Sequence, residues 1–258
     1  MNGIFSSSLQ EVERNIPVDE KKMTDVKDRQ QQPEHETKYI FHNTSAPILI
    51  RWLQLRCVAD PQFPTGIISS IYYDTGDWLL LREKLNSDYY KTKFRVRWYE
   101  ALGEAEYPDR SFVEIKYKIG ATREKIRFES EYSGKELAAK DLTDPELAAL
   151  QQQARKKGAR IPFSLYPAFQ IQYKRYRFLE PKTRCRICID YDIRAPRVNS
   201  RMLSCCKPFA VLDTGVVEVK GSIAELPDTL RQLTVLGCRK QAFSKYGSCY
   251  SILTGTFF

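Results

Sequence analysis

The chain has 258 residues, with 41 Lys and Arg against 32 Asp and Glu, which gives a formal net charge of +9. A hydrophobic fraction of 42% and an aromatic fraction of 12% exclude a mainly disordered protein, and the length suffices for one large domain or two small ones. No run of about 18 apolar residues is present, so we expect no transmembrane segment, and the polar start excludes a secretory signal. Seven cysteines, an odd number spread over this length, predict a reducing, cytoplasmic location.

The positive charge belongs to the part of the chain after Pro33. Residues 1–33 hold five bases and six acids, whereas the remainder holds 36 bases and 26 acids, a net charge of +10. The first segment is rich in Gln, Lys, Glu and Ser and has no sustained apolar period. We therefore expect a flexible polar leader over 1–33 and a folded domain over 34–258.

Hydrophobic periodicity predicts more strands than helices. Helical spacing of apolar residues predicts a helix from Thr44 or Ser45 to Val58, a second from about Asp144 to Lys157, and a short third over 227–236. Period-two alternation predicts strands over 36–41, 67–74, 89–99, 111–118, 123–129, 169–178, 184–192 and 214–220. Because helices do not alternate with these strands, an antiparallel sheet or closed barrel is favoured over a parallel doubly wound sheet.

One face of the predicted strands is unusually basic. In 91–99, Lys91, Lys93, Arg95 and Arg97 alternate with apolar residues, and the same arrangement recurs in the strands that follow. Like charges facing each other across neighbouring strands repel, so an ordinary surface sheet intersperses the signs. The pattern predicts a concave site for a polyanion. Carboxylates fall among the bases, which a divalent metal bound to phosphates would require, at Glu36, Glu114 and Glu218.

An ordered series of short motifs resembles the triphosphate tunnel metalloenzymes, the CYTH superfamily. The resemblance is closer to the polyphosphate-polymerase domain of the vacuolar transporter chaperone, VTC, and its bacterial relatives, and covers roughly Glu34 to Tyr250. An acid at Glu34 departs from the bacterial pattern and completes the Glu-x-Glu-x-Lys form of tunnel hydrolases. The motifs are Glu36-Thr37-Lys38-Tyr39, Ser70-Ile71-Tyr72-Tyr73-Asp74-Thr75, Lys93-Phe94-Arg95-Val96-Arg97-Trp98-Tyr99, Glu114-Ile115-Lys116, Lys125-Ile126-Arg127-Phe128, Tyr173-Lys174-Arg175, Arg186-Ile187-Cys188-Ile189-Asp190, Glu218-Val219-Lys220 and Phe243-Ser244-Lys245-Tyr246.

The resemblance implies an α+β fold, an antiparallel eight-stranded closed β-barrel (a triphosphate tunnel) with flanking helices. It implies that Tyr173, Lys220 and Ser244 bind substrate, that Glu218 is the main ligand of a divalent metal, Mn²⁺ or Mg²⁺, and that Glu36 and Glu114 support it. The bases carried over as catalytic are Lys38, Arg95, Arg97, Lys116, Lys125, Arg175, Arg186 and Lys245.

The activity implied is a polyphosphate polymerase that transfers the γ-phosphate of ATP to a growing inorganic polyphosphate chain. The attacking phosphate oxygen is already anionic, so catalysis needs positioning and charge neutralisation and no nucleophilic side chain. A tripolyphosphate or triphosphate hydrolase of the same fold, and a non-catalytic module that binds polyphosphate or inositol phosphates, are the alternatives. We expect ATP and inorganic polyphosphate or triphosphate as ligands and no nucleic acid, and a membrane-protein partner and the oligomeric state stay open.

Overall fold

A computed structural model describes residues 35–103, 107–203, 207–222 and 225–256. The leader predicted over 1–33 and the acid at Glu34 lie outside these residues.

All eight predicted strands are present, with ends within a few residues of those expected from the alternation. The structure adds three two-residue strands, β2 (Val58–Ala59), β9 (Ala210–Val211) and β11 (Arg239–Lys240). The long strands are β1 (His35–His42), β3 (Thr65–Asp74), β4 (Tyr90–Glu100), β5 (Ser111–Ile119), β6 (Thr122–Glu129), β7 (Tyr166–Leu179), β8 (Arg186–Ala195) and β10 (Thr214–Gly221).

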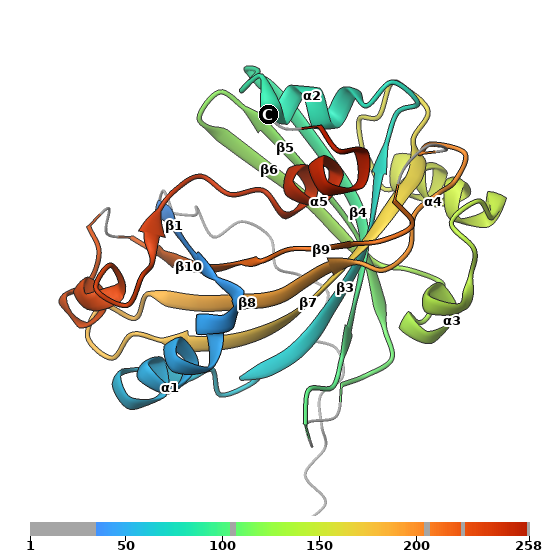
Figure 1. The fold of residues 1–258 in the computed structure, drawn as a ribbon. Helices are drawn as coiled ribbons and strands as arrows, with labels where there is room; N and C mark the ends of the chain where they lie inside the picture. Colours follow the sequence, from blue (N-terminus) through green and yellow to red (C-terminus); the bar gives the residue numbers. More distant parts are fainter. Residues whose placement is uncertain (1–34, 104–106, 204–206, 223–224, 257–258) are drawn as a thin grey trace, which may run out of the picture. The chain divides into compact units, whose positions relative to one another are not determined.

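These strands form one open sheet, so the prediction of a closed eight-stranded barrel is wrong. The order is β11-β1-β10-β8-β7-β3-β4-β5-β6, with β2 beside β7 and β9 beside β8, and every pair is antiparallel. Among the described residues, β6 pairs with β5 and with no strand of the opposite edge. Figure 1 shows the strands fanning apart, with β5 and β6 diverging from β1 and β10.

The edge strands of the open sheet are both basic, which disfavours closure. Closure would lay β6 against β11, but β6 carries Arg123, Lys125 and Arg127, and β11 consists of Arg239 and Lys240. Like charges directly opposite each other destabilise strand pairing, and charged residues are a common means of keeping sheet edges apart. The period-two pattern that predicted the strands carries no information on whether their outermost members pair.

The outer face of the sheet is covered by helices. The helix α1 (Ala46–Arg56), which follows the 3₁₀ turn η2 (Asn43–Ser45), lies over β1, β10 and β8 and buries Leu49 and Leu53 there. The third predicted helix is a short 3₁₀ segment, η3 (Asp228–Leu233), which adds Leu230 and Leu233 to the same apolar cluster.

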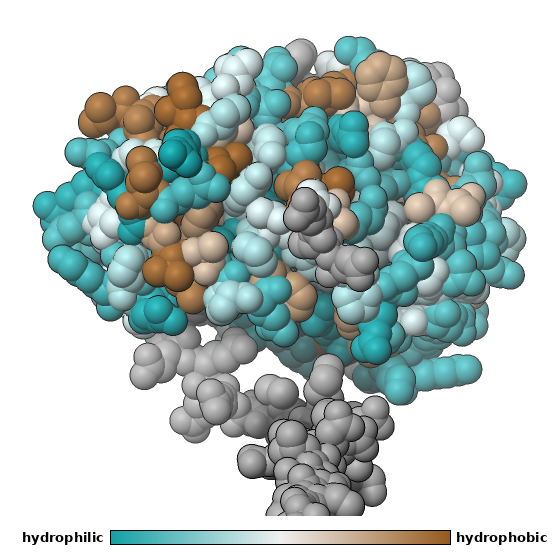
Figure 2. All heavy atoms as spheres, turned by 90° about the horizontal axis from the view of Figure 1, so that it is seen from below, coloured by the Kyte–Doolittle hydropathy of each residue, from teal (hydrophilic) through white to brown (hydrophobic). Residues whose placement is uncertain are grey.

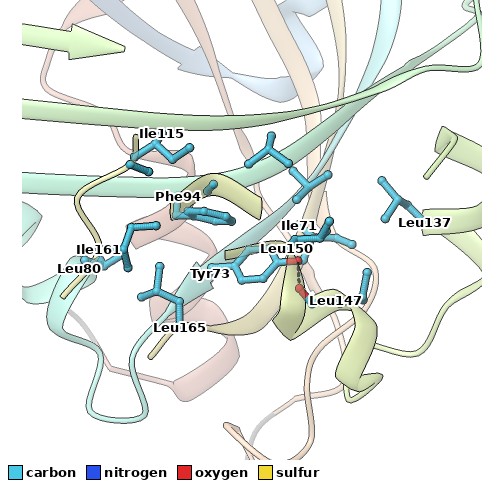
Figure 3. Packing of buried hydrophobic residues seen from close by; sticks show 14 of the residues in the cluster. Ile71, Tyr73, Leu80, Phe94, Ile115, Leu137, Leu147, Leu150, Ile161 and Leu165 are labelled. Atoms are coloured by element: carbon cyan, nitrogen blue, oxygen red, sulfur yellow. Dashed lines mark hydrogen bonds between the residues drawn. The ribbon is translucent and has the colours of Figure 1, made fainter. Parts of the chain in front are cut away.

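A second apolar cluster lies on the outer face of β3, β4 and β5, under α3 (Gly134–Ala139) and α4 (Pro145–Lys156). The prediction of α4 is confirmed down to its cap, since the Asp144 side chain accepts a hydrogen bond from the Glu146 amide and Pro145 occupies the first turn. Figure 3 shows Tyr73 of β3 within this cluster, where its hydroxyl donates a 2.8 Å hydrogen bond to the Leu147 carbonyl oxygen of α4.

We define the inner face as the face opposite α1, α3 and α4. Periodicity did not predict the helix that packs on it, α5 (Lys245–Thr254), nor α2 (Leu79–Leu85), which contributes Leu80 to the outer cluster and Leu81 to the inner face. In Figure 1, α5 lies between the diverging groups of strands. A third apolar cluster joins Leu81 of α2 and Tyr246, Cys249 and Leu253 of α5 to inner-face residues such as Phe169. The remainder of the inner face is polar and charged.

The face of the molecule seen in Figure 2 is mixed in character. In the view of Figure 2, hydrophilic residues spread over most of the face, with hydrophobic residues in small groups among them. In the part of the chain that the structure covers, no helix combines the length and apolar character needed to cross a membrane.

Substitutions two residues apart on α1 test this layering. Leu53 is completely buried and Leu55 is 71% exposed. We expect Leu53→Ala to lower the free energy of unfolding by about 2–5 kcal/mol, because it leaves a cavity under α1, and Leu55→Ala to change it by less than about 0.5 kcal/mol. Urea unfolding measures both, and equal effects would contradict the placement of α1.

Candidate functional site

The strand register brings the predicted bases together on the inner face. Residues that are direct cross-strand partners point to the same side of a sheet. Lys93, Lys116 and Lys125 are partners across β4, β5 and β6, and Arg95, Glu114 and Arg127 are partners in the neighbouring row. We call β4, β5 and β6 the basic arm.

Glu114 is the counter-charge of the basic arm. Its side chain is 4% exposed, and its Oε2 accepts hydrogen bonds from Arg95 at 2.8 Å (Nε) and 2.5 Å (Nη2). Arg97, Lys125 and Arg127 lie 3.9, 3.7 and 3.4 Å from its carboxylate oxygens. Burial would raise the pKa of Glu114, but these cations, Arg95 foremost, hold it well below the usual range. Glu114 is therefore an anion committed to holding guanidinium groups.

Tyr72 and Lys93 extend this cluster along the inner face. The Tyr72 hydroxyl accepts a 3.3 Å hydrogen bond from Arg95, and the Lys93 ammonium lies 4.8 Å from the centre of the Tyr72 ring. Burial would raise the pKa of Tyr72, but the neighbouring cations outweigh burial and lower it. Burial, together with Arg95 and other cations, lowers the pKa of Lys93 and of Lys116 to about 8.

The opposite side of the inner face carries more acid. We call β8, β10 and β1, with Arg175 of the adjoining β7, the carboxylate arm. The buried carboxylate of Asp190 receives Arg175 in a bidentate contact of 2.5 and 2.7 Å and the Lys245 ammonium of α5 at 2.6 Å. Burial opposes ionisation of Asp190, but Arg175 and Lys245 lower its pKa below the ordinary value.

Glu36 and Glu218 lie side by side on this arm among lysines. Lys38 lies 3.3 Å from Glu36 and 3.8 Å from Glu218, and Lys220 lies 3.6 Å from each. Lys245 is 3.5 Å from Glu218. Burial would raise the pKa of both carboxyl groups, but the surrounding cations lower both, that of Glu218 strongly.

The other site residues predicted from the sequence connect or border the two arms. The Tyr173 hydroxyl accepts a 3.3 Å hydrogen bond from Arg97, and its ring lies under Arg175 and Lys245, so it connects the arms. Arg186 is exposed and is the cross-strand partner of Lys220. Ser244 is the N-cap of α5, where its hydroxyl oxygen accepts a 3.2 Å hydrogen bond from the Gly247 amide.

The predicted metal ligands do not all lie together. Glu36 and Glu218 form a pair, whereas Glu114 is saturated by bases of the other arm. Among the described residues, no three His, Cys, Asp or Glu side chains cluster at metal-binding distance. Two carboxylates still fit Mg²⁺ or Mn²⁺, because Mg²⁺ is commonly held by one or two carboxylates together with substrate phosphates. Cys185 and Cys188 have metal-ligand spacing, but Cys185 packs in the cluster under α1 and Cys188 faces inward beside Glu218.

Four functional candidates on the inner face were not singled out as site residues from the sequence. Each has a signal in hindsight, since Lys93 and Arg127 continue the alternating bases, and Tyr72 and Asp190 lie within motifs quoted above. Asp190 is the most important of the four for the site, because it binds both Arg175 and Lys245. Its partner on α5 is 55 residues away in sequence, so no local pattern indicates the contact.

Ring stacking and one buried hydrogen bond of Tyr246 help to hold α5 on the sheet. The Tyr246 ring stacks between Tyr72 and Phe169 at centroid distances of 5.0 and 4.9 Å, and its hydroxyl donates a 2.8 Å hydrogen bond to Asp74 Oδ2. Asp74 is fully buried and also accepts hydrogen bonds from the amides of Leu80 and Leu81, which begin α2. Asp74 therefore ties both α2 and α5 to β3.

We expect Tyr246→Phe to destabilise the protein by about 1.5–3 kcal/mol, the usual contribution of a hydrogen bond to a charged group. Tyr166→Phe is the control, because Tyr166 is 46% exposed. Chemical denaturation measures both variants. An unchanged free energy of unfolding for Tyr246→Phe would show that the hydroxyl does not anchor α5.

Comparison with solved structures returns distant matches. A candidate adenylate cyclase from Bacillus halodurans aligns with a TM-score of 0.48 and 12% identity, over 82% of this chain and 95% of the other. A candidate adenylate cyclase from Vibrio parahaemolyticus gives a TM-score of 0.44 and 13% identity, over 86% and 99% of the two chains. No curated protein gives a significant match. The profile of the VTC domain family matches residues 33–254, nearly the whole chain, and the protein therefore belongs to the VTC domain family.

Proposed function

We propose that this VTC domain is a metal-dependent polyphosphate polymerase that transfers the γ-phosphate of ATP to the end of an inorganic polyphosphate chain. The observation that carries the proposal is the unequal charge of the two arms. The basic arm sets many cations against the single buried carboxylate of Glu114, whereas the carboxylate arm has three carboxylates, Glu36, Asp190 and Glu218, among Lys38, Lys220, Arg175 and Arg186. A phosphate chain needs the first environment, and a cation bound to phosphate needs the second.

Phosphate oxygens would bind along the basic arm. Arg95 and Arg97 present planar guanidinium groups suited to bidentate phosphate contacts, and Glu114 fixes the orientation of Arg95 before any ligand arrives. Lys93, Lys116 and Lys125 add point charges in the next row. Cations that are already in place stabilise the charge that develops during transfer without having to reorganise.

The proposed reaction needs no proton transfer by the protein. A terminal oxygen of the polyphosphate chain attacks the γ-phosphorus, the bond from that phosphorus to the β–γ bridging oxygen breaks, and ADP leaves with the electron pair. The two histidines, His35 and His42, are exposed at the ends of β1, which agrees with a mechanism that does not use them.

Glu36 and Glu218 would hold the divalent cation. Bound there, Mg²⁺ or Mn²⁺ would neutralise phosphate charge. The lysines that now surround these carboxylates, Lys38, Lys220 and Lys245, stabilise both as anions and so keep them available as ligands. Asp190 and Glu218 position the Lys245 ammonium at the junction of the two arms.

The test is incubation of the purified protein with ATP and Mn²⁺ or Mg²⁺, with polymer followed on gels and ADP measured in parallel. We expect ADP and polyphosphate to accumulate together. Release of orthophosphate without polymer would favour the triphosphate hydrolase instead, and phosphate binding without nucleotide consumption would favour the binding module.

A Glu218→Gln variant should lose metal-dependent turnover by at least about a hundredfold, if Glu218 holds the cation, and should keep its affinity for tripolyphosphate. Glu124→Gln is the control, because Glu124 lies on the outer face of β6 beside Arg160. Full turnover in Glu218→Gln would contradict the assignment of the metal site.

The lowered lysine pKa values predict that phosphate binding depends on pH. Below about 8, Lys93 and Lys116 are protonated and attract phosphate; above it they lose their charge, so the affinity for tripolyphosphate should fall as the pH rises from 7 to 9. At pH 8, binding should draw protons onto both lysines, which calorimetry in buffers of different ionisation enthalpy measures. The Lys93→Arg/Lys116→Arg variant stays cationic and should take up fewer protons than the wild type. Equal proton uptake by the two proteins would contradict the lowered pKa values of Lys93 and Lys116.

A further inference from the structure

The bases of the basic arm continue beyond the site described above. Lys91 of β4, Lys118 of β5 and Arg123 of β6 are direct cross-strand partners on the inner face, the same face as Lys93, Lys116 and Lys125. We call them the outer row, because they lie nearest to the ends of the strands. The outer row lies toward the turn between β5 and β6, two residues or about 6.6 Å further along the strands.

Positive charge rises over the first three of these rows and is as high in the fourth as in the third. The innermost row, Arg97, Phe112 and Glu129, has equal numbers of bases and acids, and the next row has Arg95 and Arg127 beside Glu114. The two rows beyond contain bases alone. Among the residues that the structure describes, no carboxylate lies within 4.0 Å of Lys91, Lys118 or Arg123. The arm therefore presents a gradient of positive charge that ends at its free hairpin.

Lys84 of α2 lies within electrostatic range of Lys91 and Lys118 of the outer row and of Glu36 on β1. Lys84 is exposed at the end of that helix. Its pKa is lowered, first by burial and then by the charges of Lys38, Lys91 and Lys118, which places these lysines near one another. Uncompensated like charges across neighbouring strands destabilise a sheet, and the outer face of β6 shows the ordinary alternative, because Glu124 there pairs with Arg160.

We propose that Lys91, Lys118 and Arg123, bordered by Lys84, form an extension of the phosphate site that holds the continuing part of a long inorganic polyphosphate chain. The choice of polyphosphate as the ligand rests on the proposed function. The existence of the extension rests on the register of β4, β5 and β6 and, within the described ranges of the chain, on the lack of carboxylates beside the outer row. A short ligand held at Arg95 and Arg127 contacts only the inner rows, whereas a long chain follows the gradient toward the hairpin. The outer row thereby distinguishes long chains from tripolyphosphate.

The test compares binding of tripolyphosphate and of long-chain polyphosphate by calorimetry over a series of salt concentrations, without turnover. The variant Lys91→Gln/Lys118→Gln/Arg123→Gln should bind the long chain at least about tenfold more weakly and tripolyphosphate within about twofold of the wild type. For flexible single-stranded polyanions, each neutralised charge contributes about 0.7 to the slope of log affinity against log salt. The slope for the long chain should therefore fall by about 2 and that for tripolyphosphate should not change.

The control removes the same charge from the outer face, with Lys135→Gln/Lys156→Gln/Lys157→Gln on and beside α3 and α4. It should leave both affinities unchanged. Equal losses for both ligands, an equal loss in the control, or no loss for the long chain would overturn the extension, as would tighter outer-row binding of single-stranded DNA than of polyphosphate. An absence of polymerase activity would overturn the proposed function and leave these expected affinities as they are.

Discussion

The basic arm depends on the buried carboxylate of Glu114. Four bases from β4 and β6 lie within 4.0 Å of one side chain that is only 4% exposed. Without this anion, burial of Arg95 and Arg97 beside Lys93 would have to be maintained against their mutual repulsion. Glu114 offsets part of that repulsion and leaves most of the positive charge uncompensated. The arm can therefore be folded before its ligand arrives and still attract a polyanion.

The two arms differ in how their carboxylates are paired. On the basic arm the Glu114 carboxylate accepts two hydrogen bonds from Arg95 on Oε2 and has Arg127 and Lys125 at 3.4 and 3.7 Å from Oε1, so it orients bases. On the carboxylate arm Glu36 and Glu218 share lysines at 3.3–3.8 Å, contacts that a divalent cation and its phosphates can replace. Tyr173 lies between the arms, in contact with Arg97 on one side and with Arg175 and Lys245 on the other. The family assignment, which rests on the sequence match over 33–254, agrees with this arrangement.

Local sequence patterns were sufficient to predict the strands, but they were insufficient to predict contacts between residues that are far apart in the sequence. Alternation located all eight long strands, and the Asp144-Pro145 pair located the start of α4, because both signals lie within a few residues. Closure was predicted wrongly, since it depends on edge strands that are remote in sequence and that here share a positive charge. The helix α5 was missed although Tyr246, Cys249 and Leu253 have helical spacing, because the segment is short and Gly247 and Ser248 lower its helix propensity. Stacking of Tyr246 on Tyr72 and Phe169 contributes to its stability. The role of Asp190 was missed because its partner Lys245 is distant in sequence, so no local pattern indicates the contact.

The place of α5 in the chain has a consequence for synthesis. The helix follows every strand of the sheet, yet it supplies Lys245 at the junction of the arms. Translation therefore completes the sheet before it delivers this ammonium group. A nascent chain that has exposed the strands but not residues 245–254 displays most of the phosphate-attracting bases with Asp190 and Glu218 still lacking one of their cations. Among the segments that the structure describes, α5 is thus the one that completes the charge balance of the site.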